Sequence, residues 1–295
     1  MIRNIFKKKR KVIIILLFII LILCLYMFYF SRSLRVRYIE LEFDDLPYSF
    51  EGTKVAFAAD MHAGLYIPTS HVKKMSDIIR KNNPDLILFA GDYIYSAPRW
   101  FHHYDSNNVR KFDEGIKDLN AKLGKYSVMG NHDNWESTTD VSNCLIRNGF
   151  KTIDNNIVFI TNEAGDYISI GGVGDFLTDK VDFDSATKGV EINNFHILLS
   201  HEPLFPLKIA REGGYNKLID FFLAGHTHGF QISFMPIKLI EFINKNREYP
   251  LMSIYGKMKA YNTKVYVTSG VGVVLLPFRL FAYPEVVIIT LKRKR

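Results

Sequence analysis

The apolar residues of the chain form one long uncharged stretch, followed by many short runs that polar turns separate. The long stretch, Val12 to Phe30, has no charged residue and ends in several aromatic residues. About 20 apolar residues in a helix span the ~30 Å hydrocarbon core of a bilayer, and aromatic side chains favour its interface. We therefore predict one transmembrane helix over about residues 12–30. A cleaved signal peptide is the alternative, although its apolar stretch is usually shorter and no Ala-x-Ala site follows here.

After residue 37 the apolar runs are four to seven residues long, and segments with apolar residues three and four positions apart stand between them. Short runs bounded by turn residues are typical of buried strands, and three-four spacing is typical of amphipathic helices. The expected strands lie at about residues 38–43, 53–59, 85–90, 126–129, 157–161, 167–171, 195–199, 221–224, 264–268 and 285–291. The expected helices lie at about residues 69–82, 109–123 and 141–148. This order predicts an α/β domain over residues 38–295, after a basic, membrane-anchoring segment, residues 1–37.

Two segments of this domain have two interpretations each. The stretch from Ile232 to Met258 is rich in apolar residues, which favours an additional packed helix; the alternative is an apolar ramp that meets the bilayer. The segment Trp100-Phe101-His102-His103 favours an ordinary exposed loop, and a lid that contacts substrate is the alternative.

Positive charge is concentrated at the two ends of the chain. Of the 38 Lys and Arg residues, nine lie in residues 1–37 and four in residues 292–295, whereas all 30 acidic residues lie between these ends. A protein that binds a phosphate backbone usually spreads positive charge over its folded face, which argues against nucleic acid as a partner. Six basic residues precede the apolar stretch and three follow it. This excess favours a cytoplasmic N-terminus and an extracytoplasmic domain, with a domain that faces the cytoplasm as the alternative.

Five of the short apolar runs end directly in side chains that can bind metals or carry protons. These residues are Asp60, His62, Asp92, Asn131, His132, His201, His226 and His228. A single histidine after a strand is usually an ordinary turn or surface residue. However, the carboxyl ends of strands in α/β sheets meet at one edge, where ligands bind. A core could not satisfy so many polar groups in one place without a compensating ion.

The side chains in this set suit two borderline divalent cations, because imidazole, carboxylate and amide oxygen are ligands for such ions. Paired cations in enzymes lie about 3.5–4 Å apart and need a carboxylate that touches both. Asp92 stands alone at the end of its strand and is the natural bridging ligand. Mn, Fe and Zn all fit this chemistry, so the identity of the metal stays open.

The order of these motifs resembles that of the calcineurin-like metallophosphoesterase superfamily. Its pattern of Asp-x-His, Gly-Asp, Gly-Asn-His-Asp, a lone His and Gly-His-x-His occurs complete and in order, within about residues 53–291. The resemblance implies a four-layer α-β-β-α sandwich with two mixed β-sheets. Carried over by motif, it implies one metal held by Asp60, His62, Asp92 and His228, and another held by Asp92, Asn131, His201 and His226. It also implies that His132 assists the leaving group and that Asp133 orients His132.

Within the superfamily, an anchor followed by a compact domain is similar to the small membrane-associated bacterial phosphoesterases. The closing stretch Pro277-Phe278-Arg279 is similar to that group as well. One position departs from the expected pattern, because Phe230 stands where a second glycine would precede Gln231. Since Phe230 follows the last metal motif, this departure concerns the choice of substrate rather than the chemistry.

The sequence therefore predicts a single-pass enzyme of the cell membrane that uses a metal-activated hydroxide to hydrolyse a phosphodiester, phosphomonoester or pyrophosphate bond. The expected substrate is a lipid or a small metabolite, and the oligomeric state stays open. One alternative is a UDP-diacylglucosamine pyrophosphatase of lipid A synthesis, which requires a domain that faces the cytoplasm. An alternative of another class is a catalytically inactive, membrane-bound binding module, although an inactive copy usually lacks some of the ligands.

Overall fold

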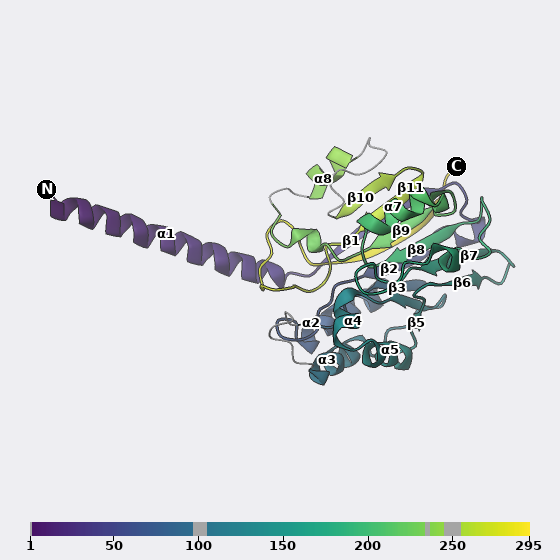
Figure 1. Cartoon of the computed structure of the whole chain (residues 1–295), viewed down its shortest axis with the longest axis horizontal. Coiled ribbons are helices and arrows are strands. Elements are labelled where there is room, and N and C mark those ends of the chain that lie inside the picture. Colours follow the sequence, from purple (N-terminus) through teal and green to yellow (C-terminus); the bar gives the residue numbers. More distant parts are fainter. Residues whose placement is uncertain (1, 97–104, 234–236, 245–254) are drawn as a thin grey trace.

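Two six-stranded β-sheets face each other at the centre of the computed structural model, which describes residues 2–96, 105–233, 237–244 and 255–295 (Figure 1). The first sheet has the strand order β1 (Arg35–Phe43), β12 (Glu285–Arg293), β2 (Lys54–Ala58), β3 (Leu86–Ala90), β4 (Lys125–Val128) and β5 (Lys151–Thr152). The second has the order β10 (Gly256–Ala260), β11 (Thr263–Val267), β9 (Phe221–Ala224), β8 (His196–Ser200), β7 (Tyr167–Gly172) and β6 (Asn156–Thr161). Each sheet contains both parallel and antiparallel neighbours, so both are mixed, as predicted.

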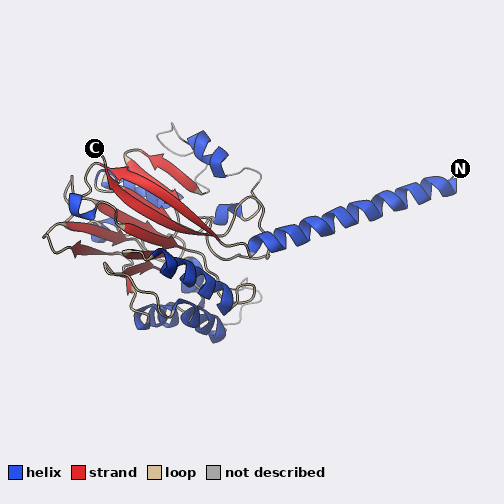
Figure 2. Ribbon diagram, turned by 180° about the vertical axis from the view of Figure 1, so that it is seen from behind, coloured by secondary structure: helices blue, strands red, loops and turns tan. Residues whose placement is uncertain are grey.

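Helices cover the outer face of each sheet and complete four layers (Figure 2). The first sheet is covered by α2 (Thr69–Asn82), α3 (Ser106–Ile116) and α5 (Thr138–Arg147). The second is covered by α6 (Phe183–Ala186) and α7 (Leu204–Glu212). A short helix, α4 (Asn131–Glu136), begins three residues after β4, and α8 (Ile237–Asn244) packs beside β10. The predicted α-β-β-α sandwich is thus confirmed.

Alternate residues of the central strands enter different cores. In β2, Ala56 and Ala58 face the helices of the first sheet, whereas Val55 and Phe57 face the second sheet. All four side chains are fully buried, as expected for a strand that is covered on both faces. The two sheets share one apolar layer, which fixes the strand ends of one sheet relative to those of the other.

The helix α1 (Ile2–Ser31) projects from the body, and its apolar residues are largely exposed (Figure 1, Figure 2). Its segment Phe6–Ser31 is long and apolar enough to cross a membrane, and only 6% of its most apolar part is buried. So much exposed apolar surface is unfavourable in water, and a bilayer is the environment that would cover it. The candidate transmembrane helix is therefore present, while the division of the chain at residue 37 stays a prediction.

The C-terminal end of α1 is part of the folded body. Phe30 and Ser31 are buried, and the Ser31 hydroxyl donates a hydrogen bond to the Pro277 carbonyl over 3.0 Å. The Arg279 N–H in turn donates to the Met27 carbonyl over 3.2 Å. The helix is thus joined to the loop that precedes β12, although the two are far apart in the sequence.

The observed strands begin and end within three residues of the expected positions, and β5 and β10 are additional. The helix expected over residues 109–123 ends earlier, at Ile116. The additional packed helix expected in the apolar stretch is α8, whose Ile240 is buried against Tyr255 and Ala282. Trp100, Phe101, His102 and His103 lie outside the described residues, as do residues 234–236 and 245–254.

Candidate metal centre

Polar side chains from both sheets meet beyond the carboxyl ends of five strands. They comprise Asp60 and His62 after β2, Asp92 after β3, Asn131 after β4, His201 after β8, and His226 and His228 after β9. All are buried except His226, which is half-buried. The structure therefore brings together all seven residues that the sequence singled out as ligands.

Glycines allow these strand ends to approach one another closely. A Cβ on Gly130 would overlap the Asp92 carboxylate, and a Cβ on Gly225 would lie 2.6 Å from an oxygen of Asp60. Neither position has room for a side chain, so the glycine before Asn131 and the glycine before His226 are packing requirements.

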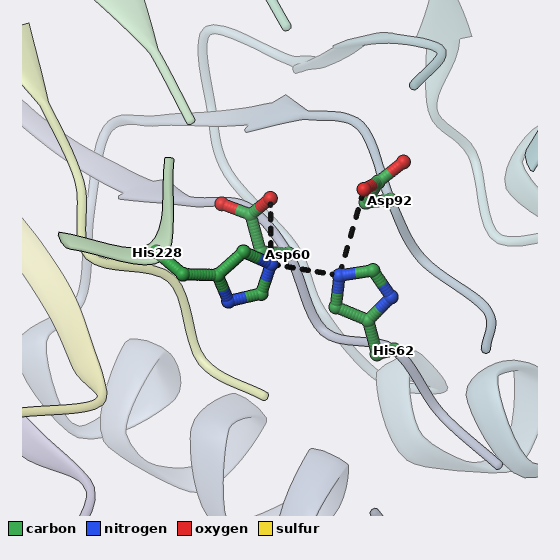
Figure 3. Close-up of side chains that lie close together, drawn as sticks. All are labelled: Asp60, His62, Asp92 and His228. Carbon is green, nitrogen blue, oxygen red and sulfur yellow. Dashed lines mark hydrogen bonds and ion pairs between the residues drawn. The ribbon is translucent and has the colours of Figure 1, made fainter. Parts of the chain in front are cut away.

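Asp60, His62, Asp92 and His228 form the first group of side chains, whose ligand atoms all lie within 4.8 Å of one another (Figure 3). The Nε2 atoms of His62 and His228 are 2.9 Å apart. An oxygen of Asp92 lies 3.5 Å from Nε2 of His62, and an oxygen of Asp60 lies 3.5 Å from Nε2 of His228. Two atoms bound to one ion at about 2.1 Å lie about 3–3.5 Å apart, so these spacings fit a single cation.

The second group contains Asp92, His201 and His226, with Asn131 beside them. Nε2 of His201 lies 3.3 Å from an oxygen of Asp92 and 3.1 Å from Nδ1 of His226. The side-chain oxygen of Asn131 also lies 3.1 Å from Nδ1 of His226. Asp92 therefore belongs to both groups, which is the position required of a carboxylate that bridges two cations.

Metal binding requires neutral imidazoles, which burial favours at His62, His226 and His228. Burial lowers the pKa of His62 to about 3 and that of His226 to about 4. At His201 burial acts in the same direction, but the neighbouring Asp92 carboxylate outweighs it and raises the pKa of His201 well above its usual value. In His201, Nδ1 lies 2.7 Å from the carbonyl of Ala90, which can only accept a hydrogen bond. Nδ1 therefore carries a hydrogen, and Nε2 is the nitrogen that faces the second group, where a cation would have to displace its proton.

Five of the seven residues have a left-handed backbone conformation. Their φ angles are +55° at Asp60, +46° at His62, +57° at Asp92, +67° at His226 and +52° at His228. This conformation costs an L-residue about 1–2 kcal/mol, and it is uncommon outside glycine. Strained backbone concentrates at functional sites, because the surrounding structure must hold it in place. The concentration of this conformation at five of the seven candidate ligands agrees with a functional site.

Comparison with known proteins agrees with this geometry. A family model for the calcineurin-like phosphoesterases matches residues 53–230, a range that includes all seven side chains. The chain belongs to this family. Its predicted class, a metal-dependent phosphoester hydrolase, is thereby confirmed.

Three proteins of similar sequence show how much of this chain is shared with its relatives. The metallophosphoesterase YkuE of Bacillus subtilis is 30% identical over 84% of this chain and 82% of its own length. A metallophosphoesterase of Aquifex aeolicus is 28% identical over 88% of this chain and 93% of its own length. A Danio rerio protein named as a transmembrane protein with a metallophosphoesterase domain is 25% identical over 86% of this chain and 56% of its own length. The likeness therefore extends well beyond the part that the family model matches.

His132 lies beside the two groups of side chains. Its ring packs edge-on against the ring of His62, with the ring centres 4.7 Å apart, and its backbone N–H donates to Asp92 over 2.9 Å. Its ring atom Nδ1 is buried and has no hydrogen-bond partner among the described residues. Packing therefore holds the ring next to the candidate metal site without engaging that nitrogen.

The Asp133 carboxylate contacts backbone N–H groups of two neighbouring loops, while its predicted role of orienting His132 stays a prediction. Its carboxylate accepts hydrogen bonds from the backbone N–H groups of Asp92 and Tyr93, both over 2.8 Å, and of Gly130 over 3.0 Å. Asp133 lies in the first turn of α4, where a carboxylate meets free backbone N–H groups. It therefore joins the loop after β3 to the loop after β4, and so positions Asp92.

Arg279 is part of this region, although the sequence did not identify it as such. It is fully buried, and its guanidinium donates to the carbonyls of Ser269 over 2.7 Å, Gly272 over 2.6 Å and His228 over 3.2 Å. Burial lowers the pKa of Arg279 to about 10, so the side chain remains charged at neutral pH. A buried charge needs such compensation, and here the carbonyls that supply it include that of a candidate ligand. The available sequence signal was a lone arginine in an apolar closing stretch.

We expect added Mn²⁺ to raise the unfolding temperature of the metal-free protein by about 5–10 °C at a concentration near 100 times its Kd. The reason is that a cation would bind buried carboxylates and imidazoles that are brought together only in the folded state. Thermal scans with and without a chelator would measure the shift. An unchanged unfolding temperature with Mn²⁺, Zn²⁺ and Fe²⁺ would contradict the assignment of these side chains as ligands.

We expect Asp133→Asn to reduce the free energy of unfolding by about 3 kcal/mol, because an amide nitrogen would replace an oxygen that accepts backbone hydrogen bonds. Metal affinity should fall as well, since the loop of Asp92 loses its support. Asp182→Asn is a suitable control, because Asn also caps helices well and should leave the unfolding temperature unchanged. If Asp133→Asn kept both stability and metal content but lost turnover, Asp133 would act through His132 after all.

Proposed function

We propose that the phosphoesterase is a membrane-anchored enzyme with two divalent cations, which hydrolyses a phosphodiester, phosphomonoester or pyrophosphate bond of a lipid or small metabolite. The observation that carries this proposal is the position of Asp92 within 3.5 Å of imidazole nitrogens from both groups. A single cation would need no such shared carboxylate, whereas a pair would.

In this proposal, Asp60, His62, Asp92 and His228 would hold one cation, and Asp92, Asn131, His201 and His226 would hold the other. Cations bound in such a pair activate water for attack on phosphorus and neutralise charge on the phosphoryl oxygens. The burial of the ligands supports this use, because electrostatic interactions are stronger away from bulk water.

His132 would give a proton to the departing oxygen. Its ring lies next to His62 but outside both ligand groups, so its nitrogens are not committed to a cation. Proton donation of this kind contributes about 10²–10⁴ in rate. The hydrogen bond from the His132 backbone N–H to Asp92 would hold the imidazole of His132 at a fixed position relative to the cations.

The proposed location is the cell membrane, with α1 as an uncleaved anchor and the domain on the extracytoplasmic side. The burial of Phe30 and Ser31 and their contacts with the body support an anchor over a cleaved signal peptide, because cleavage would remove part of the fold. Alkaline phosphatase or green fluorescent protein fused after Arg295 would test the orientation. Fluorescence of the second fusion without activity of the first would place the domain in the cytoplasm.

The activity itself can be tested on the full-length chain in detergent. We expect the metal-free protein to gain turnover of p-nitrophenyl phosphomonoesters or phosphodiesters when Mn²⁺, Zn²⁺ or Fe²⁺ is added. Asp92→Asn provides the inactive reference, so contaminating phosphatases can be subtracted. An absence of turnover with every metal and substrate would favour the inactive binding module.

A further inference from the structure

Five exposed apolar side chains, Phe230, Ile232, Leu275, Leu276 and Phe281, come from two segments that lie against each other; we refer to them as the apolar rim. Phe230 follows the candidate ligand His228 by two residues and is 67% exposed, and Leu275 is 64% exposed. Two backbone bridges pair Ile232 with Leu280 and Phe281, so the two segments are in direct contact. The rim is therefore one surface beside the metal centre.

Three residues of the apolar rim are held in a strained conformation that exposes them. Phe230 has φ +61°, Leu275 has φ +61° and Phe281 has φ +60°. Bulky apolar residues rarely adopt this region, and glycine would occupy it without cost. A contiguous exposed apolar surface of this kind is typical of a site that binds a partner or a membrane.

Hydrogen bonds hold the loop that carries Leu275 and Leu276 in place. The side-chain amide of Gln231 donates to the Val274 carbonyl over 2.8 Å and accepts from the Val274 N–H over 2.6 Å. In the same loop, the Gly272 N–H donates to the Asp60 carbonyl over 2.7 Å. The loop that carries Leu275 and Leu276 is thus tied both to the residue after Phe230 and to the loop of a candidate ligand.

The other end of this loop is tied to the membrane helix. Pro277 accepts a hydrogen bond from Ser31, and Arg279 donates one to Met27, both at the end of α1. In Figure 1 the yellow loop before β12 lies at the point where α1 leaves the body. The rim therefore stands between the metal centre and the end of the helix that would enter the bilayer.

We propose that the apolar rim rests in the interface of the same bilayer that α1 crosses, and that the metal centre takes its phosphoester from a membrane lipid. The second part rests on the proposed function, whereas the first does not. The continuity of the rim with the end of α1 identifies the partner as lipid rather than protein.

The position of the rim can be measured in the full-length protein without a substrate. A Leu275→Cys variant in a Cys24→Ser background would carry a fluorescent NBD label at residue 275. Cys144 is buried and so would not react with the label. The labelled protein would be placed in vesicles of phosphatidylethanolamine and phosphatidylglycerol. Phe159→Cys is the matched control, because Phe159 is an exposed residue of the edge strand β6. We expect brominated lipids to quench the label at residue 275 and not at residue 159. Equal, weak quenching at both sites would overturn the docking of the rim.

The lipid substrate can be tested with two diesters that share a leaving group. Methyl p-nitrophenyl phosphate remains in solution, whereas hexadecyl p-nitrophenyl phosphate is held in the vesicle. The double variant Phe230→Gly, Leu275→Gly removes two rim side chains at positions that glycine tolerates, so it should fold. We expect the ratio of vesicle-bound to soluble turnover to fall about tenfold in this variant and to stay constant in Phe159→Thr.

The outcomes separate the two parts of the proposal. Turnover of the soluble diester with none of the vesicle-bound one, or an unchanged ratio in the double variant, would overturn the lipid substrate. If the wild-type protein hydrolysed neither diester with any divalent metal, the lipid diester would be overturned, and turnover of p-nitrophenyl phosphate would decide separately whether the proposed function holds. The quenching result would still decide whether the rim lies in the membrane.

Discussion

Asp92→Asn is expected to abolish the binding of both cations and to lower kcat/KM for phosphodiesters by about 10³-fold or more, since the lost charge stabilisation amounts to several kcal/mol. Asp92 lies 3.5 Å from Nε2 of His62 in one group and 3.3 Å from Nε2 of His201 in the other. An Asn side chain has the same shape as Asp92 and can still accept the hydrogen bond from the His132 backbone N–H. It lacks the negative charge and directs a donor group at imidazole nitrogens. Elemental analysis of the purified variant would count the bound metals.

A control for this substitution lies just before the same strand. Asp85 precedes β3, accepts a hydrogen bond from the Lys54 N–H over 2.8 Å and pairs with Lys122, away from the candidate ligands. Asp85→Asn removes the same charge from the other end of β3 and should retain both metals and nearly full turnover. Two metals per chain in Asp92→Asn would refute the bridging role, whatever the activity.

His132→Ala is expected to retain both cations and yet to lose about 10²–10⁴ in kcat for substrates with a poor leaving group. The metal content should survive because the side chain lies outside both ligand groups, and because its bond to Asp92 comes from the backbone N–H. An alkoxide leaving group needs a proton to depart, whereas p-nitrophenolate does not.

The comparison of these two leaving groups in the same variant is its own control. If His132→Ala lost turnover of an alkyl phosphodiester but kept near-normal turnover of a p-nitrophenyl diester, the role of proton donor would be assigned to His132. Equal losses on both substrates would indicate damage to the metal site instead. Full activity of the variant on an alkyl phosphodiester would remove His132 from the mechanism.

The sequence predicted the sheets and the ligand set well, because both follow from short-range patterns. Apolar runs such as Val55 to Ala58 are buried on both faces and can form little except a central strand. The polar residues after such runs must leave the core at the strand end. The carboxyl ends of the strands then bring Asp60 and His228 together, although 168 positions separate them.

Features that depend on three-dimensional packing were not predictable in this way. The role of Asp133 is set by which backbone N–H groups lie within reach, and those of Asp92 and Tyr93 come from another strand end. The guanidinium of Arg279 is buried among carbonyls of two segments, that of His228 and those of Ser269, Gly272 and Ala282. Hydrophobicity alone would place both residues at the surface. Exposed residues with positive φ, such as Leu275, likewise have no signal in the local sequence.

The pairing of β1 with β12 has a consequence for how the protein is made. Among the residues that the structure describes, these are the first and last strands, and they pair in parallel from Arg35 with Glu285 to Phe43 with Arg293. During synthesis β1 emerges directly behind α1, while its partner is still untranslated. Such distant contacts form slowly, because the intervening chain must first be ordered. The first sheet can therefore be completed only after β12 has been synthesised, and until then β1 lacks the strand with which it pairs.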